Sequence, residues 1–284
     1  MAANPEVVSP DPVLYESRYE STGPAQSDTA LELIETLHSV RATSHAILRG
    51  QMRIASDLPP NLAQGLFAHG ATYPLVMCFS TNSGATSRGL AVKVIGVAGD
   101  RIRGSDGDLT QDFVMVDRTR ALDGGPRRHI LGETFFSMTP FLYGKYMAKF
   151  SIAPASTELR ALQKAPLPLA GKPNGLRESA IAFFQEHGAD WELRVQLCVD
   201  IDQMPIENPK IAWAESLCAW LPIARIVVPP QLAWSEARAK ALADRFSFSP
   251  WHGLAAHRPL GSINRLLRKP SAIDEPRDLA QFPD

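Results

Sequence analysis

The stretch that decides the fold is Tyr73–Gly96, YPLVMCFSTNSGATSRGLAVKVIG. It carries one short apolar segment, Leu75–Thr81, and the start of a second, Leu90–Val97, both with the residue types that favour strands. The residues between them are small or polar and include two glycines, which is typical of a turn. The stretch therefore predicts two neighbouring antiparallel strands, since a parallel pair needs a crossover helix.

The same pattern continues on both sides of this pair. Further strands are predicted at His45–Ile54, Phe113–Asp117, Lys145–Ile152, Trp191–Asp200 and Ile223–Val228, and Gly or Pro bounds most of them. Helices are predicted at residues 28–40, Asn174–His187 and Ser235–Phe246 from their caps and apolar periodicity. Seven strands with few helices between them favour an α+β fold built on an antiparallel sheet or barrel.

Composition bounds the kind of protein. The chain has 284 residues, with Lys+Arg 29 against Asp+Glu 30, and 45% of its residues are hydrophobic. The charge balance excludes a polybasic nucleic-acid binder, and the apolar content suffices for one large domain or two modest ones. No apolar run approaches the roughly 20 residues of a membrane helix. Residues 1–12 have no signal-peptide pattern, so we expect a cytoplasmic protein that does not bind membranes.

Common catalytic and metal motifs are not found. The seven histidines show no HxH or HExxH spacing, and the three cysteines form no CxxC pair. The glycine-containing stretch Gly99–Asp108 has neither the dinucleotide nor the phosphate-loop pattern, so a charged turn between two strands is the simpler interpretation.

Several segments taken together resemble the haem-binding catalase superfamily, in particular its small single-domain, catalase-related members. Tyr73–Gly96 is similar to the family's FSTxxGE…RGFAVKF stretch. The other matching segments are Arg41–Gly50, Asp108–Val116, Trp191–Gln196, Asn208–Ala224 and Phe246–Arg265, in the family's order. The resemblance implies an antiparallel β-barrel core with flanking helices and haem b beside the barrel. It places the catalase-like domain at residues 28–270, between an N-terminal arm, 1–27, and a C-terminal tail, 271–284.

The resemblance also assigns roles on the peroxide side of the haem. In register with the family's motif, Arg41 stands at the position of the distal histidine, and His45 at that of the motif's second histidine. An arginine polarises a bound peroxide but is a poor base, because its pKa exceeds 12. We therefore expect His45 or His38 to carry the proton.

The position of the family's axial tyrosine is Ser271, and no tyrosine follows Tyr146. A serine hydroxyl is a weak iron ligand, so His252 and His257 are alternatives as metal ligands. The other interpretation of both histidines is that they lie in turns and hydrogen-bond the backbone.

The resemblance suggests further contacts with the cofactor. Two phenylalanines would line the haem pocket and four arginines would pair with its propionates: Phe79, Phe113, Arg49, Arg88, Arg265 and Arg268. The alternative is that the phenylalanines belong to the barrel core and that the strand arginines are solvated surface charges.

The function implied by the resemblance is that of a haem-iron oxidoreductase acting on hydrogen peroxide or organic hydroperoxides. Peroxidase action is favoured over efficient catalase turnover, because the distal histidine and axial tyrosine are both replaced. The alternative is a non-catalytic barrel that binds haem, an apolar ligand or a partner as a scaffold, and the shortened region between residues 117 and 129 favours it. Neither hypothesis involves nucleic acid, and a homo-oligomer assembled through the arm stays open.

Overall fold

The computed structural model describes residues 10–12, 15, 43–81, 88–105, 109–117, 128–137, 139–167, 169, 171–209 and 211–266. The expected N-terminal arm, the tail and the helix predicted at residues 28–40 lie almost entirely outside the described residues. Among the residues that are described, no helix is long and apolar enough to cross a membrane.

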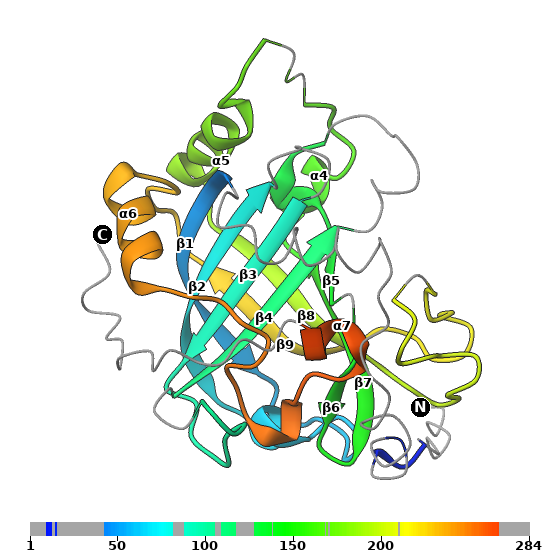
Figure 1. Cartoon of the computed structure of the whole chain (residues 1–284). Coiled ribbons are helices and arrows are strands. Elements are labelled where there is room, and N and C mark those ends of the chain that lie inside the picture. Colours follow the sequence, from blue (N-terminus) through cyan, green and yellow to red (C-terminus); the bar gives the residue numbers. More distant parts are fainter. Residues whose placement is uncertain are drawn as a thin grey trace.

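The centre of the molecule is an antiparallel β-barrel (Figure 1). Its strands are β1 (Thr43–Ile54), β2 (Thr72–Thr81), β3 (Arg88–Ile95), β4 (Thr110–Asp117), β5 (Phe135–Phe136), β6 (Phe141–Tyr143), β7 (Tyr146–Pro154), β8 (Ala189–Leu197) and β9 (Leu221–Val228). The order β5-β4-β3-β2-β1-β9-β8-β7 is closed by pairing of β5 with β7, and β6 pairs with the other end of β7. The α+β fold with an antiparallel barrel core is confirmed.

The seven predicted strands are all present, with two differences. The strand predicted to reach Asp200 ends at Leu197, because the Asp200 carboxylate accepts hydrogen bonds from the backbone N–H groups of Asp202 and Gln203 and so forms a turn. The short strands β5 and β6 were not predicted, since two or three residues carry no readable alternation.

Alternation along the strands fills the barrel interior. On β1, Leu48 and Met52 face the main core, whereas Ile47 faces outward and packs with residues of helix α6 (Glu236–Arg245). The interior is rich in aromatic side chains, and the rings of Phe113 and Phe150 make an edge-to-face contact with centroids 5.1 Å apart. The inside of the barrel is therefore a packed core.

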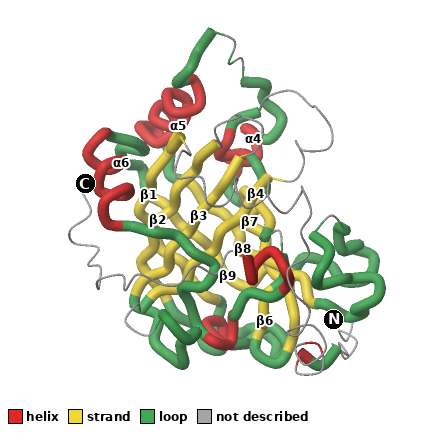
Figure 2. The backbone as a smooth tube through the Cα atoms, in the orientation of Figure 1, coloured by secondary structure: helices red, strands yellow, loops and turns green. Residues whose placement is uncertain are grey.

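The helices lie around the barrel (Figure 2). Helices α4 (Thr157–Leu162) and α5 (Gly175–Glu186) cover one end, where both contact the 3₁₀ turn η2 (Ile130–Gly132). Helix α6 begins after Ser235, whose hydroxyl accepts the N–H of Arg238, as its cap predicted. Helix α7 (Gly261–Leu266) leads toward the C-terminal tail. The turns η1 (Gly65–Phe67) and η3 (Ala255–His257) lie at the other end of the barrel.

Candidate functional site

Four polar side chains are buried where α5 covers the barrel, and we call them the barrel-end cluster: His45, Thr81, Arg88 and Glu133. His45 lies at a β-bulge near the start of β1 and is only 4% exposed. Its Nε2 is 2.9 Å from the hydroxyl oxygen of Thr81. Its Nδ1 has no hydrogen-bond partner within the described part of the chain. The sequence predicted this histidine as a proton carrier, and the structure adds Thr81 as its partner.

His45 is uncharged at neutral pH. Burial, together with the positive charges of Arg177 and Arg88, lowers the pKa of its imidazole to about 4. A neutral imidazole has one N–H donor and one acceptor nitrogen. When Nε2 donates to Thr81, Nδ1 holds the lone pair that can take a proton from a nearby molecule.

Arg88 and Glu133 form a buried ion pair in the same cluster. Arg88 lies at the start of β3, Glu133 follows η2, and Nη1 of the guanidinium donates to Oε1 of the carboxylate. Both side chains are buried, so the interpretation of Arg88 as a solvated surface charge is wrong. The pair fixes a positive charge close enough to His45 to affect its pKa.

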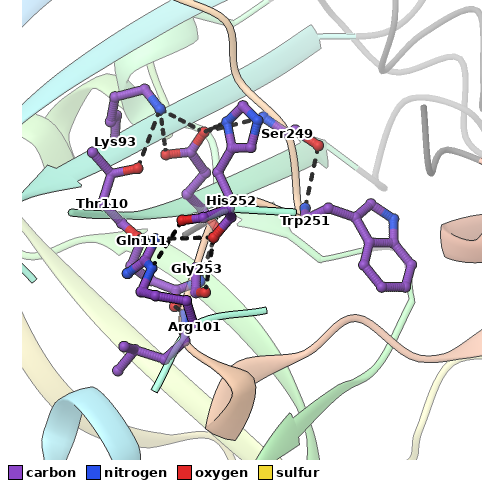
Figure 3. Close-up of polar contacts among 11 residues, drawn as sticks. Lys93, Arg101, Thr110, Gln111, Ser249, Trp251, His252 and Gly253 are labelled. Carbon is purple, nitrogen blue, oxygen red and sulfur yellow. Dashed lines mark hydrogen bonds and ion pairs between the residues drawn. The ribbon is translucent and has the colours of Figure 1, made fainter. Parts of the chain in front are cut away.

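A second polar group lies on the outer wall of the barrel, and we call it the wall cluster: the buried Lys93 and Asp112 with the partly buried Ser249 and His252 (Figure 3). The ammonium of Lys93 donates to both oxygens of Asp112, at 2.8 and 2.9 Å. Asp112 Oδ2 also accepts the backbone N–H of Ser249 at 3.1 Å and lies 3.4 Å from His252 Nδ1. His252 is thus held beside a carboxylate that is already neutralised by a lysine.

The chain around His252 is tied to strand β4 by further bonds. The Gln111 amide oxygen accepts the backbone N–H of Leu254 at 3.0 Å, and the Asp112 N–H donates to the His252 carbonyl at 2.9 Å. Gly253 lets this approach happen, because a Cβ there would come within 2.5 Å of the Gln111 amide. The wall cluster therefore fastens the segment 249–254 across the barrel wall.

His257 lies at the opposite end of the barrel among the rings of Phe67, Tyr143 and Phe150. Its Nε2 accepts the Leu66 N–H at 2.9 Å, and its Nδ1 is 3.4 Å from the Leu142 carbonyl oxygen. Burial lowers the pKa of its imidazole to about 4. Both nitrogens thus face backbone groups, as in the alternative interpretation of this histidine.

The arginine predicted near the proximal side is engaged with an acid. Arg265 on α7 pairs with Glu207 through two contacts of 3.0 and 3.2 Å. The same carboxylate accepts the hydroxyl of Tyr15 and the backbone N–H of Ser262. Burial, together with Glu207, raises the pKa of the Tyr15 phenol, so it stays protonated. This group joins the N-terminal arm to α7.

The remaining predicted residues are spread over the molecule. Phe79 and Phe113 lie in the barrel core, where Phe79 contacts the rings of Phe135 and Trp191. The peptide N–H and carbonyl of Arg49 bond the side chain of Gln231. His38, Arg41, Arg268 and Ser271 lie outside the described residues. Of the described residues, no three His, Cys, Asp or Glu lie together as a group that could hold a metal ion.

The fold can now be compared with known proteins. No protein-family model and no curated protein sequence matches this chain. Solved structures do match: a fungal catalase has a TM-score of 0.56 at 13% identity over 81% of this chain, and catalase A from Saccharomyces cerevisiae has 0.56 at 11% identity over 93%. The chain has a catalase-like fold. It spans 58% and 66% of the lengths of those catalase chains.

Sequence reasoning missed the acids and hydroxyls that complete the barrel-end cluster and the wall cluster. Lys93 lies on the strand predicted at Leu90–Val97, and Asp112 comes just before the one predicted at Phe113–Asp117, but only the observed register, which places them opposite each other, reveals the pair. Glu133 follows a stretch for which no structure was predicted. Thr81 does have a signal, since it ends the strand adjacent to the one that carries His45.

Proposed function

We propose that this catalase-like chain binds haem b and acts on hydrogen peroxide or an organic hydroperoxide, as a peroxidase rather than an efficient catalase. The observation that carries the proposal is the buried, neutral His45 with Nε2 on Thr81 and Nδ1 without a partner among the described residues. A base that moves a proton between peroxide oxygens needs this combination of a lone pair and a fixed ring.

The residues supply the acid–base half of such a site. His45 Nδ1 takes a proton from one peroxide oxygen and returns it to the other, while Thr81 fixes the ring. Arg177 and Arg88 raise the positive potential around the imidazole and so favour the hydroperoxide anion that forms when His45 takes the proton. Haem, when bound, supplies the redox chemistry that separates the two oxygens.

The described residues fit the haem itself less well than they fit the peroxide. Arg88 and Arg265 are each paired with a glutamate, and His257 has a backbone partner at each nitrogen. We therefore propose that the haem contacts come from Arg41, Arg268 and the segment around Ser271, with His252 as the alternative iron ligand. Arg41 would polarise the peroxide, and His38 is the second proton carrier.

The second candidate function is a non-catalytic barrel that acts as a scaffold for haem, an apolar ligand or a partner. The packed aromatic interior and the engagement of the predicted haem residues in pairs of their own favour it. A homo-oligomer is compatible with either function.

An absorption spectrum of the purified chain after incubation with haem separates the two functions. A Soret band that changes on addition of peroxide supports the peroxidase proposal, and no Soret band would overturn it. If haem binds, a change of the Soret band in His252→Ala identifies His252 as the iron ligand. The same change in Ser271→Ala identifies Ser271 instead.

The role of His45 has its own test. We expect His45→Ala to lower the rate of peroxide reduction about a hundredfold, which is the lower end of the usual contribution of a general base. His187→Ala is the matched control, since the side chain of that histidine is 47% exposed. Equal rates in the two variants would exclude His45 as the proton carrier, and the Soret band of each reports whether haem binding is unchanged.

A further inference from the structure

A cleft opens beside the barrel end, next to helix α4. It has a volume of about 590 Å³ and is lined by Arg128, Gly132, Glu133, Thr134, Gln163, Lys164 and Pro166. Its walls are fixed by the backbone, because Arg128 bridges Pro166 and Gly132 lies so close to the end of α4 that a Cβ would come within 2.9 Å of the Gln163 nitrogen. The volume falls in the range of sites for small molecules.

The cleft carries two cations that have no acidic partner. Among the residues that the structure describes, neither Arg128 nor Lys164 forms an ion pair, and both are exposed. Elsewhere on the surface, cations do find acids, as in Arg194 with Glu192 at 2.6 Å and Arg225 with Asp190 at 2.9 Å. The two cleft cations are therefore available to a ligand.

The one carboxylate of the cleft does not cancel this charge. Glu133 is directed to the buried guanidinium of Arg88, which neutralises it. The other polar side chains of the wall are the Thr134 hydroxyl and the Gln163 amide, and neither has a side-chain partner in the described part of the chain. Guanidinium, ammonium, hydroxyl and amide N–H groups are all hydrogen-bond donors, and donors of this kind recognise oxyanions.

We propose that this cleft binds a small molecule through a phosphate or carboxylate group, with Arg128 and Lys164 as its charged contacts and Thr134 and Gln163 as its neutral ones. The cleft shares Glu133 with the barrel-end cluster, but the proposed binding involves neither His45 nor haem.

The test is calorimetric titration of the purified chain, in a low-salt buffer without phosphate, with inorganic phosphate and separately with succinate. We expect saturable binding of at least one probe, and the one that binds identifies the group. Lys164→Gln and Arg128→Gln should each weaken that binding about tenfold, because each removes a charge-assisted hydrogen bond to the anion. Lys164→Arg keeps the charge and should retain most of the affinity.

Lys172→Gln is the matched control, since Lys172 is exposed and close to Lys164 in sequence but does not line the cleft. If Lys172→Gln weakens the binding as much as Lys164→Gln does, the effect comes from the net charge of the chain, and the site is overturned. The absence of saturable binding for both probes would overturn it too. Because no haem or peroxide is used, either result is independent of the proposed peroxidase function.

Discussion

The barrel-end cluster and the wall cluster are both built on β3, on its two opposite faces. Arg88 shares the face of Leu90 and Val92, which point into the barrel, and pairs with Glu133. Lys93 points outward and pairs with Asp112 on β4. Each cluster thus contains one buried cation, one buried acid and one histidine, and the two histidines differ in burial, at 4% for His45 and 14% for the His252 side chain.

In the wall cluster, both oxygens of the acid are held by hydrogen bonds. Asp112 receives Lys93 at both oxygens and Ser249 at one, and its backbone bonds the carbonyl of His252. In the barrel-end cluster, by contrast, the Nδ1 atom of His45 has no partner among the described residues, and Glu133 borders a cleft. Buried polar groups with complete partners stabilise and specify a fold, whereas incomplete ones mark places where a molecule can bind.

Acid should lower the free energy of unfolding through the buried histidines of the barrel end, and this is the largest effect that we expect. Burial, with a contribution from Arg88, lowers the pKa values of His45 and His129 from 6.5 to about 4. Between these values the unfolded chain binds more protons than the folded one, so stability is full above pH 6.5 and is lost as the pH falls toward 4. Each histidine accounts for about 3 kcal/mol over that window, at 1.36 kcal/mol per pKa unit.

Urea unfolding between pH 7 and pH 4.5 measures this loss. His45→Gln does not titrate, so its stability should fall less steeply with decreasing pH than that of the unaltered chain. His187→Gln, at an exposed position, should leave the slope unchanged. An unaltered slope in His45→Gln would mean that His45 binds protons equally in the folded and unfolded chains, so that burial does not lower its pKa.

Lys93→Met attacks the wall cluster and should cost about 3–5 kcal/mol in free energy of unfolding. The substitution leaves the Asp112 carboxylate buried without its cation, which is the costly case for a buried pair. Adding Asp112→Asn removes the stranded charge while keeping an oxygen for the Ser249 N–H, so the double variant should be more stable than Lys93→Met alone. If the loss in the double variant equals the sum of the losses in Lys93→Met and in Asp112→Asn, the two side chains are not coupled.

Arg88→Met is the corresponding change at the barrel end, and its cost should be smaller, about 2 kcal/mol. Glu133 borders the cleft, where water can hydrate a carboxylate that has lost its guanidinium. Urea unfolding of Arg88→Met beside Lys93→Met gives the comparison directly. A larger loss for Arg88→Met would show that the barrel end is as closed as the wall.

The barrel could be predicted from sequence because strand alternation and turn residues are local signals. The stretch Tyr73–Gly96 predicted two strands, and all seven predicted strands exist. Strand alternation by itself favoured a sheet or a barrel equally, because closure depends on β5, a strand of two residues that pairs with β7; only the resemblance to the catalase superfamily implied the barrel.

The site was predictable only in part, for a similar reason. His45 was identified from a motif, but its neutral state follows from burial and from Arg177 on a helix far along the chain. Arg88 and Arg265 were predicted as ligand contacts because a sequence shows a charge but not its partner. The acids that hold them, Glu133 and Glu207, lie 45 and 58 residues away.

The smallest effect tests how tightly the wall holds the segment 249–254. Gly253→Ala places a methyl group against the Gln111 amide, which must move and give up the N–H of Leu254. We expect a loss of about 1 kcal/mol in urea unfolding, the net value of one hydrogen bond. In a Gln111→Ala background the amide is gone, so Gly253→Ala should then cost close to nothing. If it costs the same in both backgrounds, the methyl group collides with something other than Gln111, and this bond does not hold the segment.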